Sequence, residues 1–382
     1  MEAPAAQVET AAAQGLMQIT GVELVAVQTV REMGQRKPAD AEKARSNHVV
    51  VRLHTAAGIV GLGEMSDVNW SVAPAALAAL RERLEAVLVG REICELTALQ
   101  MDLGREAWAH QVLCGIDIAL YDALARSLDV PLHQLFGGKV RERVPFAYPL
   151  APCRDAADRR ANLDRVERLQ EAGHRALRYY FGQALDEDEL FLREMRRRWG
   201  DAVELVALDA SGRFAVAEAV AAVQRFAEFA PGLYESPVRG RHDAPVEDFL
   251  AVAAQSPAPI GEHITDFAVA ARLQEAVDVF NTGLGYAGIA ACRKVLAVAE
   301  VCGNAALMGS TVEMSIGTAA RVHLAAATPH LAFPCYMAGP LVYDEDVVGE
   351  PVQYCEGHIV IPEGPGLGVE LDGARMKKIQ LA

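Results

Sequence analysis

The sequence predicts an α/β protein: a (β/α)7β TIM-like barrel with an N-terminal α+β capping domain that the C-terminal segment completes. From about residue 144 onward, short apolar runs alternate with helix-like segments, a pattern typical of parallel strands joined by helices. Three of these runs lead into the acidic residues Asp209, Glu235 and Glu262. In a parallel barrel these side chains would meet at the C-terminal mouth, where such barrels hold their chemistry. An open doubly wound sheet is the competing architecture.

The composition narrows the class of protein. The chain has 382 residues, of which 52% are apolar, so it is long enough for a large barrel and a smaller companion domain. Its formal net charge of −15 disfavours nucleic acid and anionic membranes as partners. No apolar run reaches membrane-spanning length. Seven widely spaced cysteines without a Cys-x-x-Cys pair indicate reduced thiols and a cytoplasmic location.

The first 140 residues are predicted to contain a mobile tail and the capping domain. Residues 1–18 are rich in alanine and lack the basic and apolar regions of a signal peptide, so they are interpreted as the tail. The capping domain, residues 19–140, begins with strands at 19–30, 48–54 and 58–64 and has a polar loop at 33–44. Helices are expected at 74–88, 95–104 and 113–128, the last with apolar residues at helical spacing.

The strand–helix alternation assigns residues 141–340 to the barrel domain. Strands are expected at 144–150, 176–181, 204–209, 233–235, 258–261, 277–281, 305–308 and 331–335. Helices at 158–172, 215–229, 266–275 and 289–301 are expected between them. Residues 341–382 no longer alternate, and we expect this segment to return to the capping domain as a strand and tight turns.

The acidic strand ends Asp209, Glu235 and Glu262 predict a metal site. Carboxylates held close together raise one another's pKa unless a cation compensates them. An all-oxygen acidic site suits Mg²⁺, or Mn²⁺, better than zinc. A divalent cation would stabilise the negative charge of an enolate formed next to a substrate carboxylate. The alternative for Asp209 is an ordinary turn, in which its side chain caps a backbone amide.

Strand alternation places Arg178 and Tyr180 on one face of the 176–181 strand and Leu177, Tyr179 and Phe181 on the other. The second set would pack against helices, so Arg178 and Tyr180 would point into the barrel mouth. Arginine does not readily lose its proton, so Arg178 is expected to hold a carboxylate. Tyr180 would act as a base if Arg178 and the metal lower its pKa from about 10. The alternative is a structural pair, with Arg178 salt-bridged to a ligand acid and Tyr180 inert.

Several motifs follow one another along most of the chain. They are the hairpin end at 58–64, the helix segment Ala119-Leu120-Tyr121-Asp122, the turn Gly137-Gly138, the acids Asp209, Glu235 and Glu262, and the stretch 309–318. In this order they resemble the enolase superfamily, in particular its muconate cycloisomerase (muconate lactonizing) branch, related to mandelate racemase. The resemblance implies that the three acids bind the metal and that the loop at 33–44 is a lid over the site. A plain solvated loop is the alternative for residues 33–44.

The resemblance also draws attention to two departures from the family pattern. Arg178-Tyr179-Tyr180 stands where the family carries Lys-x-Lys, and Thr282 or Gly283 stands where the cycloisomerase branch has another lysine. The usual acid/base lysines are therefore expected to be replaced. Some acid-sugar dehydratases of the superfamily are similar in using tyrosine or arginine near these positions.

Three further groups of residues are expected near the substrate. Glu313 matches a glutamate of the cycloisomerase branch and would donate a proton or orient the substrate. Thr282 and Thr311 are predicted to bind substrate. His263 is also assigned a supporting role at the substrate, and it would alternate away from Glu262 if the strand continues.

Together these observations predict a divalent-metal-dependent enzyme that acts on a small carboxylate through an enolate-like intermediate, most similar to a lactonizing cycloisomerase. One alternative is an acid-sugar dehydratase or an epimerase/racemase that uses Tyr180 and Arg178. An alternative of another class is a metal-binding barrel with little or no turnover. A homo-oligomer is expected from the resemblance.

Overall fold

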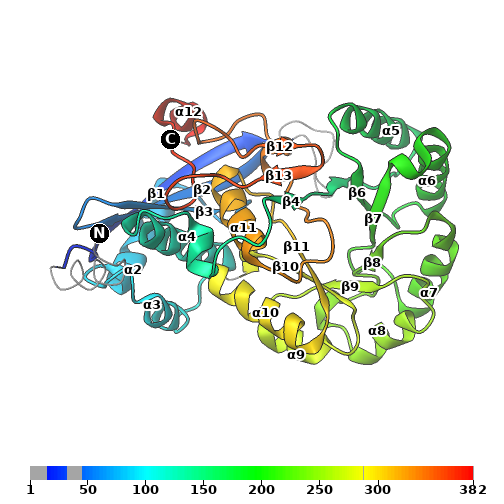
Figure 1. Cartoon of the computed structure of the whole chain (residues 1–382), viewed down its shortest axis with the longest axis horizontal. Coiled ribbons are helices and arrows are strands. Elements are labelled where there is room, and N and C mark those ends of the chain that lie inside the picture. Colours follow the sequence, from blue (N-terminus) through cyan, green and yellow to red (C-terminus); the bar gives the residue numbers. More distant parts are fainter. Residues whose placement is uncertain (1–14, 32–44, 287, 382) are drawn as a thin grey trace.

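The computed structural model describes residues 15–31, 45–286 and 288–381. Figure 1 shows an antiparallel sheet with helices at one side and a ring of strands and helices at the other. The predicted lid loop at 33–44 lies outside the described residues. So does most of the predicted tail, although residues 15–18 are described and Met17 among them is buried.

The first sheet consists of β1 (Ile19–Val30), β2 (Arg45–Thr55) and β3 (Val60–Met65), all antiparallel in that order. Three helices follow this sheet along the chain: α2 (Pro74–Leu88), α3 (Leu96–Leu103) and α4 (His110–Ser127). Helix α4 lies very close to β3 because glycines form the contact. A Cβ atom on Gly63 would stand 1.9 Å from the Gly115 carbonyl oxygen, so a larger residue would push the helix away.

The second sheet is parallel throughout and curls into a barrel (Figure 1). Its strands, in spatial order, are β5 (Tyr148–Leu150), β6 (Ala176–Tyr180), β7 (Glu204–Asp209), β8 (Leu233–Glu235), β9 (Ile260–His263), β10 (Val279–Thr282) and β11 (Ala305–Met308). Helices follow the strands: α5 (Ala156–Glu171), α6 (Leu185–Trp199), α7 (Val216–Arg225), α8 (Val246–Ala253), α9 (Phe267–Leu273), α10 (Gly288–Cys302) and α11 (Ser315–Ala327).

An irregular segment at 331–336 closes the barrel. Its amides at Ala332 and Tyr336 donate to carbonyls of β11, and its Cys335 exchanges backbone hydrogen bonds with Pro145 and Ala147 beside β5. This is where an eighth strand was expected. The closure decides against an open doubly wound sheet.

Two predicted barrel strands end later than expected. The run at 258–261 is extended as β9 to His263, and the run at 277–281 is extended as β10 to Thr282. The predicted strand at 144–150 is instead two strands, because β4 (Arg143–Pro145) pairs with β13 (His358–Val360) whereas β5 pairs with β6. These shifts matter for the site below, because each added residue changes which side chain stands at the mouth.

The C-terminal segment ties the two parts together. It contains β12 (Tyr354–Cys355), β13 and α12 (Gly373–Ile379), and the Leu367 amide donates to Asp122 of α4 at 2.7 Å. His323 of α11 contacts the Leu367 carbonyl oxygen with Nε2 at 3.1 Å. The predicted fold class, a barrel with a capping domain that the C-terminal segment completes, is therefore confirmed. No helix in the described part of the chain is both long and apolar enough to cross a bilayer.

Candidate active site

Apolar side chains fill the barrel interior, and polar side chains lie at its mouth, the C-terminal end of the strands. Small and aliphatic side chains, among them Ala207, Leu233, Val279 and Leu307, fill the interior. Above this layer the strand ends carry polar residues that face one another: Arg178 and Tyr180 on β6, Asp209 on β7, Glu235 on β8, His263 on β9 and Asn281 on β10. The predicted orientation of β6 agrees with this, since Leu177, Tyr179 and Phe181 pack in the outer core.

The side chain of Arg178 lies at the centre of this group. Its Nη2 donates to Asp209 Oδ2 at 2.5 Å and to Glu235 Oε1 at 2.7 Å. Its Nε donates to Glu235 Oε2 at 2.9 Å, and its Nη1 donates to the Tyr180 hydroxyl. The guanidinium carbon stands 4.2 Å from the Tyr180 ring centroid and 4.7 Å from that of Tyr336, so two aromatic faces also attract the cation.

Glu235 receives donors on both carboxylate oxygens. Besides Arg178, its Oε1 accepts from Asn281 Nδ2 at 2.6 Å and lies 2.6 Å from His263 Nε2. The other ring nitrogen of His263, Nδ1, lies 2.8 Å from the Tyr286 hydroxyl. If Nε2 carries the proton that binds Glu235, Nδ1 is the acceptor that Tyr286 needs.

Burial and charge oppose each other in this group. Burial opposes ionisation of Glu235, but the charge of Arg178 and the hydrogen bond from His263 hold the pKa of Glu235 well below its usual range. Burial raises the pKa of Asp209, an effect that Arg178 only partly offsets. Burial disfavours a charged Arg178, yet both acids raise its pKa well above the usual value, so it stays protonated. Burial lowers the pKa of His263.

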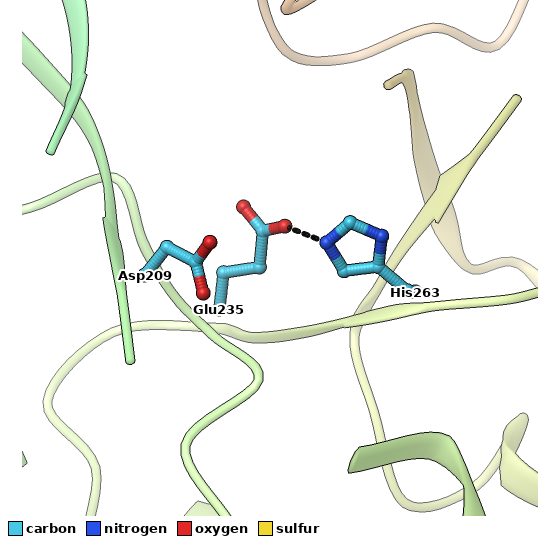
Figure 2. A group of neighbouring side chains, drawn as sticks. All are labelled: Asp209, Glu235 and His263. Atoms are coloured by element: carbon cyan, nitrogen blue, oxygen red, sulfur yellow. Dashed lines mark ion pairs between the residues drawn. The ribbon is translucent and has the colours of Figure 1, made fainter. Parts of the chain in front are cut away.

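Asp209, Glu235 and His263 form a candidate metal site, shown in Figure 2. One ligand atom from each lies within 4.8 Å of the others, which is consistent with a divalent ion. The donor types suit such an ion, but the guanidinium of Arg178 occupies the position that the ion would need. Arg178 Nη2 touches both acids and lies 3.5 Å from His263 Nε2. In this arrangement an ion and the guanidinium exclude one another, so the group of residues as folded does not fit a bound metal.

The expected third ligand, Glu262, is not part of this group. Because β9 runs on to His263, it is Gly261 and His263 that face the interior, and Glu262 pairs in register with the outer-core residue Phe280. The Glu262 Oε1 accepts from Ser236 Oγ at 2.7 Å and from the His263 amide at 2.6 Å, and its buried Oε2 has no partner among the described residues. Burial raises the pKa of Glu262 to about 8, so it is neutral at pH 7.

The predicted role of Thr282 changes for a similar reason. Thr282 is buried and its hydroxyl faces Cys292 of α10, on the outer side of β10, so it does not line the mouth as a substrate-binding residue. The inward residue of β10 is Asn281. The charge of Arg178 lowers the pKa of Tyr180, as expected, but burial raises that pKa by more, so Arg178 alone does not bring it below its usual value.

Glu313 and Thr311 lie together in the loop that follows β11. Glu313 is buried and forms an ion pair with Arg321. It also accepts from the Thr311 amide and hydroxyl, both at 2.6 Å, and from Ser310 Oγ at 2.8 Å. Thr311 therefore holds Glu313 in place. The predicted proton-donating role of Glu313 and the predicted substrate-binding role of Thr311 stay predictions.

Several residues of the mouth were not predicted from the sequence. Asn281 ends a predicted strand just as Asp209 does, so the same rule would have found it. Arg241 follows β8 in a short 3-10 turn, and its charge lowers the pKa of both Asp209 and Glu262. Tyr286 and Tyr336 come from irregular segments whose direction no periodicity reveals.

Comparisons with known proteins cover nearly the whole chain. Residues 161–375 match the family described as enolase C-terminal domain-like, and residues 22–137 match the N-terminal domain of mandelate racemase / muconate lactonizing enzyme. The chain belongs to this family. Muconate cycloisomerase 1 of Rhodococcus opacus is 30% identical over 375 residues, which cover 93% of this chain and 97% of that protein. A chloromuconate cycloisomerase of Pseudomonas putida is 29% identical, with coverage of 87% and 91%.

Solved structures agree with this assignment. The muconate lactonizing enzyme of Pseudomonas fluorescens, complexed with muconolactone, matches with a TM-score of 0.85 at 25% identity and covers 96% of this chain and all of that one. A 2-chloromuconate cycloisomerase of Rhodococcus opacus 1CP also gives a TM-score of 0.85, at 23% identity, which speaks for the shared fold. This member of the enolase superfamily is thus related to cycloisomerases.

Proposed function

We propose that this protein is an enzyme that lactonizes a small dicarboxylate, as a muconate cycloisomerase does, through an enolate-like intermediate. The observation that carries the proposal is the buried group of charges at the barrel mouth, in a chain that is 30% identical to a muconate cycloisomerase over 93% of its length. An enolate next to a carboxylate carries negative charge on oxygen. A fixed cation at the mouth stabilises such charge where it develops.

The substrate carboxylate has a suitable binding group in Arg241. Its buried Nε has no hydrogen-bond partner among the described residues. Its charge lowers the pKa of Asp209 and of His263, two residues of the mouth, so Arg241 lies close to them. It can lie there because Gly212, with φ of +70°, has no side chain: a Cβ atom would stand 2.4 Å from Arg241 Cγ. A planar guanidinium binds a carboxylate through paired hydrogen bonds.

Lactonization requires a proton donor rather than a base. One carboxylate oxygen of the substrate adds to a carbon of the double bond conjugated with the other carboxylate, which becomes an enolate. The carbon next to that carboxylate then takes a proton. Tyr180 is suited to give it, because burial raises its pKa and its hydroxyl accepts from Arg178, which leaves its own proton for donation.

A second candidate, epimerization or dehydration of a hydroxy acid, is favoured by His263. Such reactions begin with removal of the proton next to the carboxylate and need a base. Burial lowers the pKa of His263, which keeps the ring neutral at pH 7. Glu235 orients the ring at Nε2, and Nδ1 faces the Tyr286 hydroxyl, as in a carboxylate–histidine pair prepared to take up a proton.

The direct test is turnover of a small panel of substrates. The purified protein is mixed with cis,cis-muconate, its chlorinated analogues and simple hydroxy acids, and products are identified by NMR. Lactone formation that falls at least about hundredfold in Tyr180→Phe, a loss typical of a missing general acid, supports the proposal. Tyr234→Phe is the matched control, since this buried hydroxyl of β8 donates outward to the Val223 carbonyl oxygen.

Other outcomes separate the alternatives. Turnover of hydroxy acids that depends on His263 and not on Tyr180 would move the assignment to an epimerase or dehydratase. No turnover of any substrate in the panel would favour a binding protein without catalysis.

A further inference from the structure

The position of Arg178 has a consequence for the metal requirement of this protein. One nitrogen atom, Nη2, is in contact with Asp209 Oδ2 at 2.5 Å and Glu235 Oε1 at 2.7 Å, and it lies 3.5 Å from His263 Nε2. Mg²⁺ would bind the same donor atoms at about 2.0–2.1 Å. It would therefore need the space that this nitrogen occupies.

The lone pairs that a metal would use are also engaged. Glu235 Oε1 faces three nitrogen atoms, those of Arg178, Asn281 and His263, and its Oε2 accepts from Arg178 Nε. An ion at this place would have to displace several of these donors at once. If His263 carries its proton on Nε2, it would further have to move that proton before this nitrogen could bind a metal.

Charge and packing keep the guanidinium where it is. Two buried carboxylates surround one cation that does not lose its proton. A divalent ion beside it would add two positive charges at contact distance, and like charges repel strongly away from water. The rings of Tyr180 and Tyr336 enclose the guanidinium, and the Tyr180 hydroxyl accepts from Nη1.

We propose that Arg178 is the resident cation of this site, so that the protein does not bind a divalent metal at Asp209, Glu235 and His263 and does not need one. The guanidinium pairs with both acids in the resting protein and faces the place where enolate charge would develop. The second part rests on the proposed function, whereas the absence of metal binding can be tested without any substrate.

The test is a titration of the full chain with Mn²⁺, followed by calorimetry and by the electron paramagnetic resonance signal of free Mn²⁺. We expect no saturable binding in the wild type. In Arg178→Met, one saturable equivalent is expected, at least about tenfold tighter than the weakest binding that the titration detects, a difference of about 1.4 kcal/mol. Adding Asp209→Asn should abolish that new binding, since it removes one ligand.

Arg241→Met is the matched control. It removes an equal charge near the same acids but leaves Arg178 Nη2 between them, so it should not create a metal site. If it binds Mn²⁺ as well as Arg178→Met does, general repulsion and not occupancy explains the result, and the proposal fails. One saturable equivalent in the wild type that Asp209→Asn removes would also overturn it. This wild-type titration decides the matter even if Arg178→Met does not fold.

Turnover measured in EDTA separates this inference from the proposed function. Turnover that persists in EDTA without Mn²⁺ binding supports both. Turnover that requires Mg²⁺ overturns the inference and leaves the proposed function intact. Absence of both turnover and Mn²⁺ binding refutes the proposed function, while the first part of the inference stands.

Discussion

Replacing Arg178 with methionine measures how strongly the buried charges depend on this cation. The Arg178 side chain is 5% exposed, and those of Asp209 and Glu235 are 2% and 0% exposed, so the carboxylates have almost no access to solvent. Removing one partner of a buried ion pair costs about 3–5 kcal/mol, because the other charge stays buried and uncompensated. For a chain of this length the unfolding entropy is about 0.8 kcal/mol/K, so the midpoint should fall by about 4–6 °C.

The assay is differential scanning calorimetry at pH 7.5 in EDTA. Arg241→Met should lose less than about 1 kcal/mol of unfolding free energy, as is usual for a partly exposed position. The double variant Arg178→Met/Asp209→Asn should recover part of the loss, because one of the two uncompensated charges is gone. A loss below about 1 kcal/mol in Arg178→Met, or an equal loss in Arg241→Met, would show that Arg178 does not stabilise the acids, and would refute the reasoning.

Three further predictions concern other parts of the molecule. Burial raises the pKa of Asp117 to about 6 in the folded protein, whereas an unfolded chain has an Asp pKa of about 3.9. The folded state therefore binds the proton more tightly, and stability falls as the pH rises from about 4 to about 6. Relative to Asp117→Asn, the wild type should lose up to about 3 kcal/mol between pH 4 and 7, measured by urea denaturation at each pH. Arg241→Met should raise KM for the carboxylate substrate that the protein turns over by about tenfold or more, because a charged hydrogen bond to that substrate is lost. Steady-state kinetics should show a much smaller change in kcat. Gly63→Ala should lower the unfolding midpoint by several degrees, because its Cβ would overlap the Gly115 carbonyl oxygen.

Each of these has a result that would contradict it. A pH-independent difference between the wild type and Asp117→Asn would mean that this carboxylate is not buried as described. A change in kcat without a change in KM would remove Arg241 from substrate binding. Gly63→Ala with unchanged stability would mean that β3 and α4 are further apart than the structure has them. Gly349→Ala is the matched control, because a Cβ atom there meets open space and, as at Gly63, φ is not positive.

Much of the fold was predictable because its signals are local. Short apolar runs and turns defined the strands that end in Asp209 and Glu235, and period-two alternation gave the direction of Arg178 and Tyr180. These are properties of a few neighbouring residues.

The errors at the site have one physical origin. The end of a parallel strand is set by its hydrogen bonds to the neighbouring strands, and these are not visible in the strand's own sequence. Two additional residues in β9 placed His263 at the mouth and turned Glu262 outward. One additional residue in β10 made Thr282 part of the strand, facing outward, so that Asn281 is the residue at the mouth.

The position of the Arg178 guanidinium could not be predicted from spacing. Alternation gives the direction of a side chain but not how far it reaches. Whether a long side chain ends beside two acids or between them depends on how strongly the sheet curls, which is a property of the whole barrel. The sequence left a binding role and a structural ion pair open for Arg178, and the structure shows the ion pair.

The measurement that tests the central claim most directly is deuterium incorporation in D₂O with EDTA present. The purified protein is incubated with muconolactone, and NMR follows the carbon next to the free carboxylate. Enolate formation with Arg178 as the cation predicts that deuterium appears there at the same rate with EDTA as with added Mg²⁺. Exchange that occurs only with Mg²⁺, or no exchange under either condition, would contradict the account.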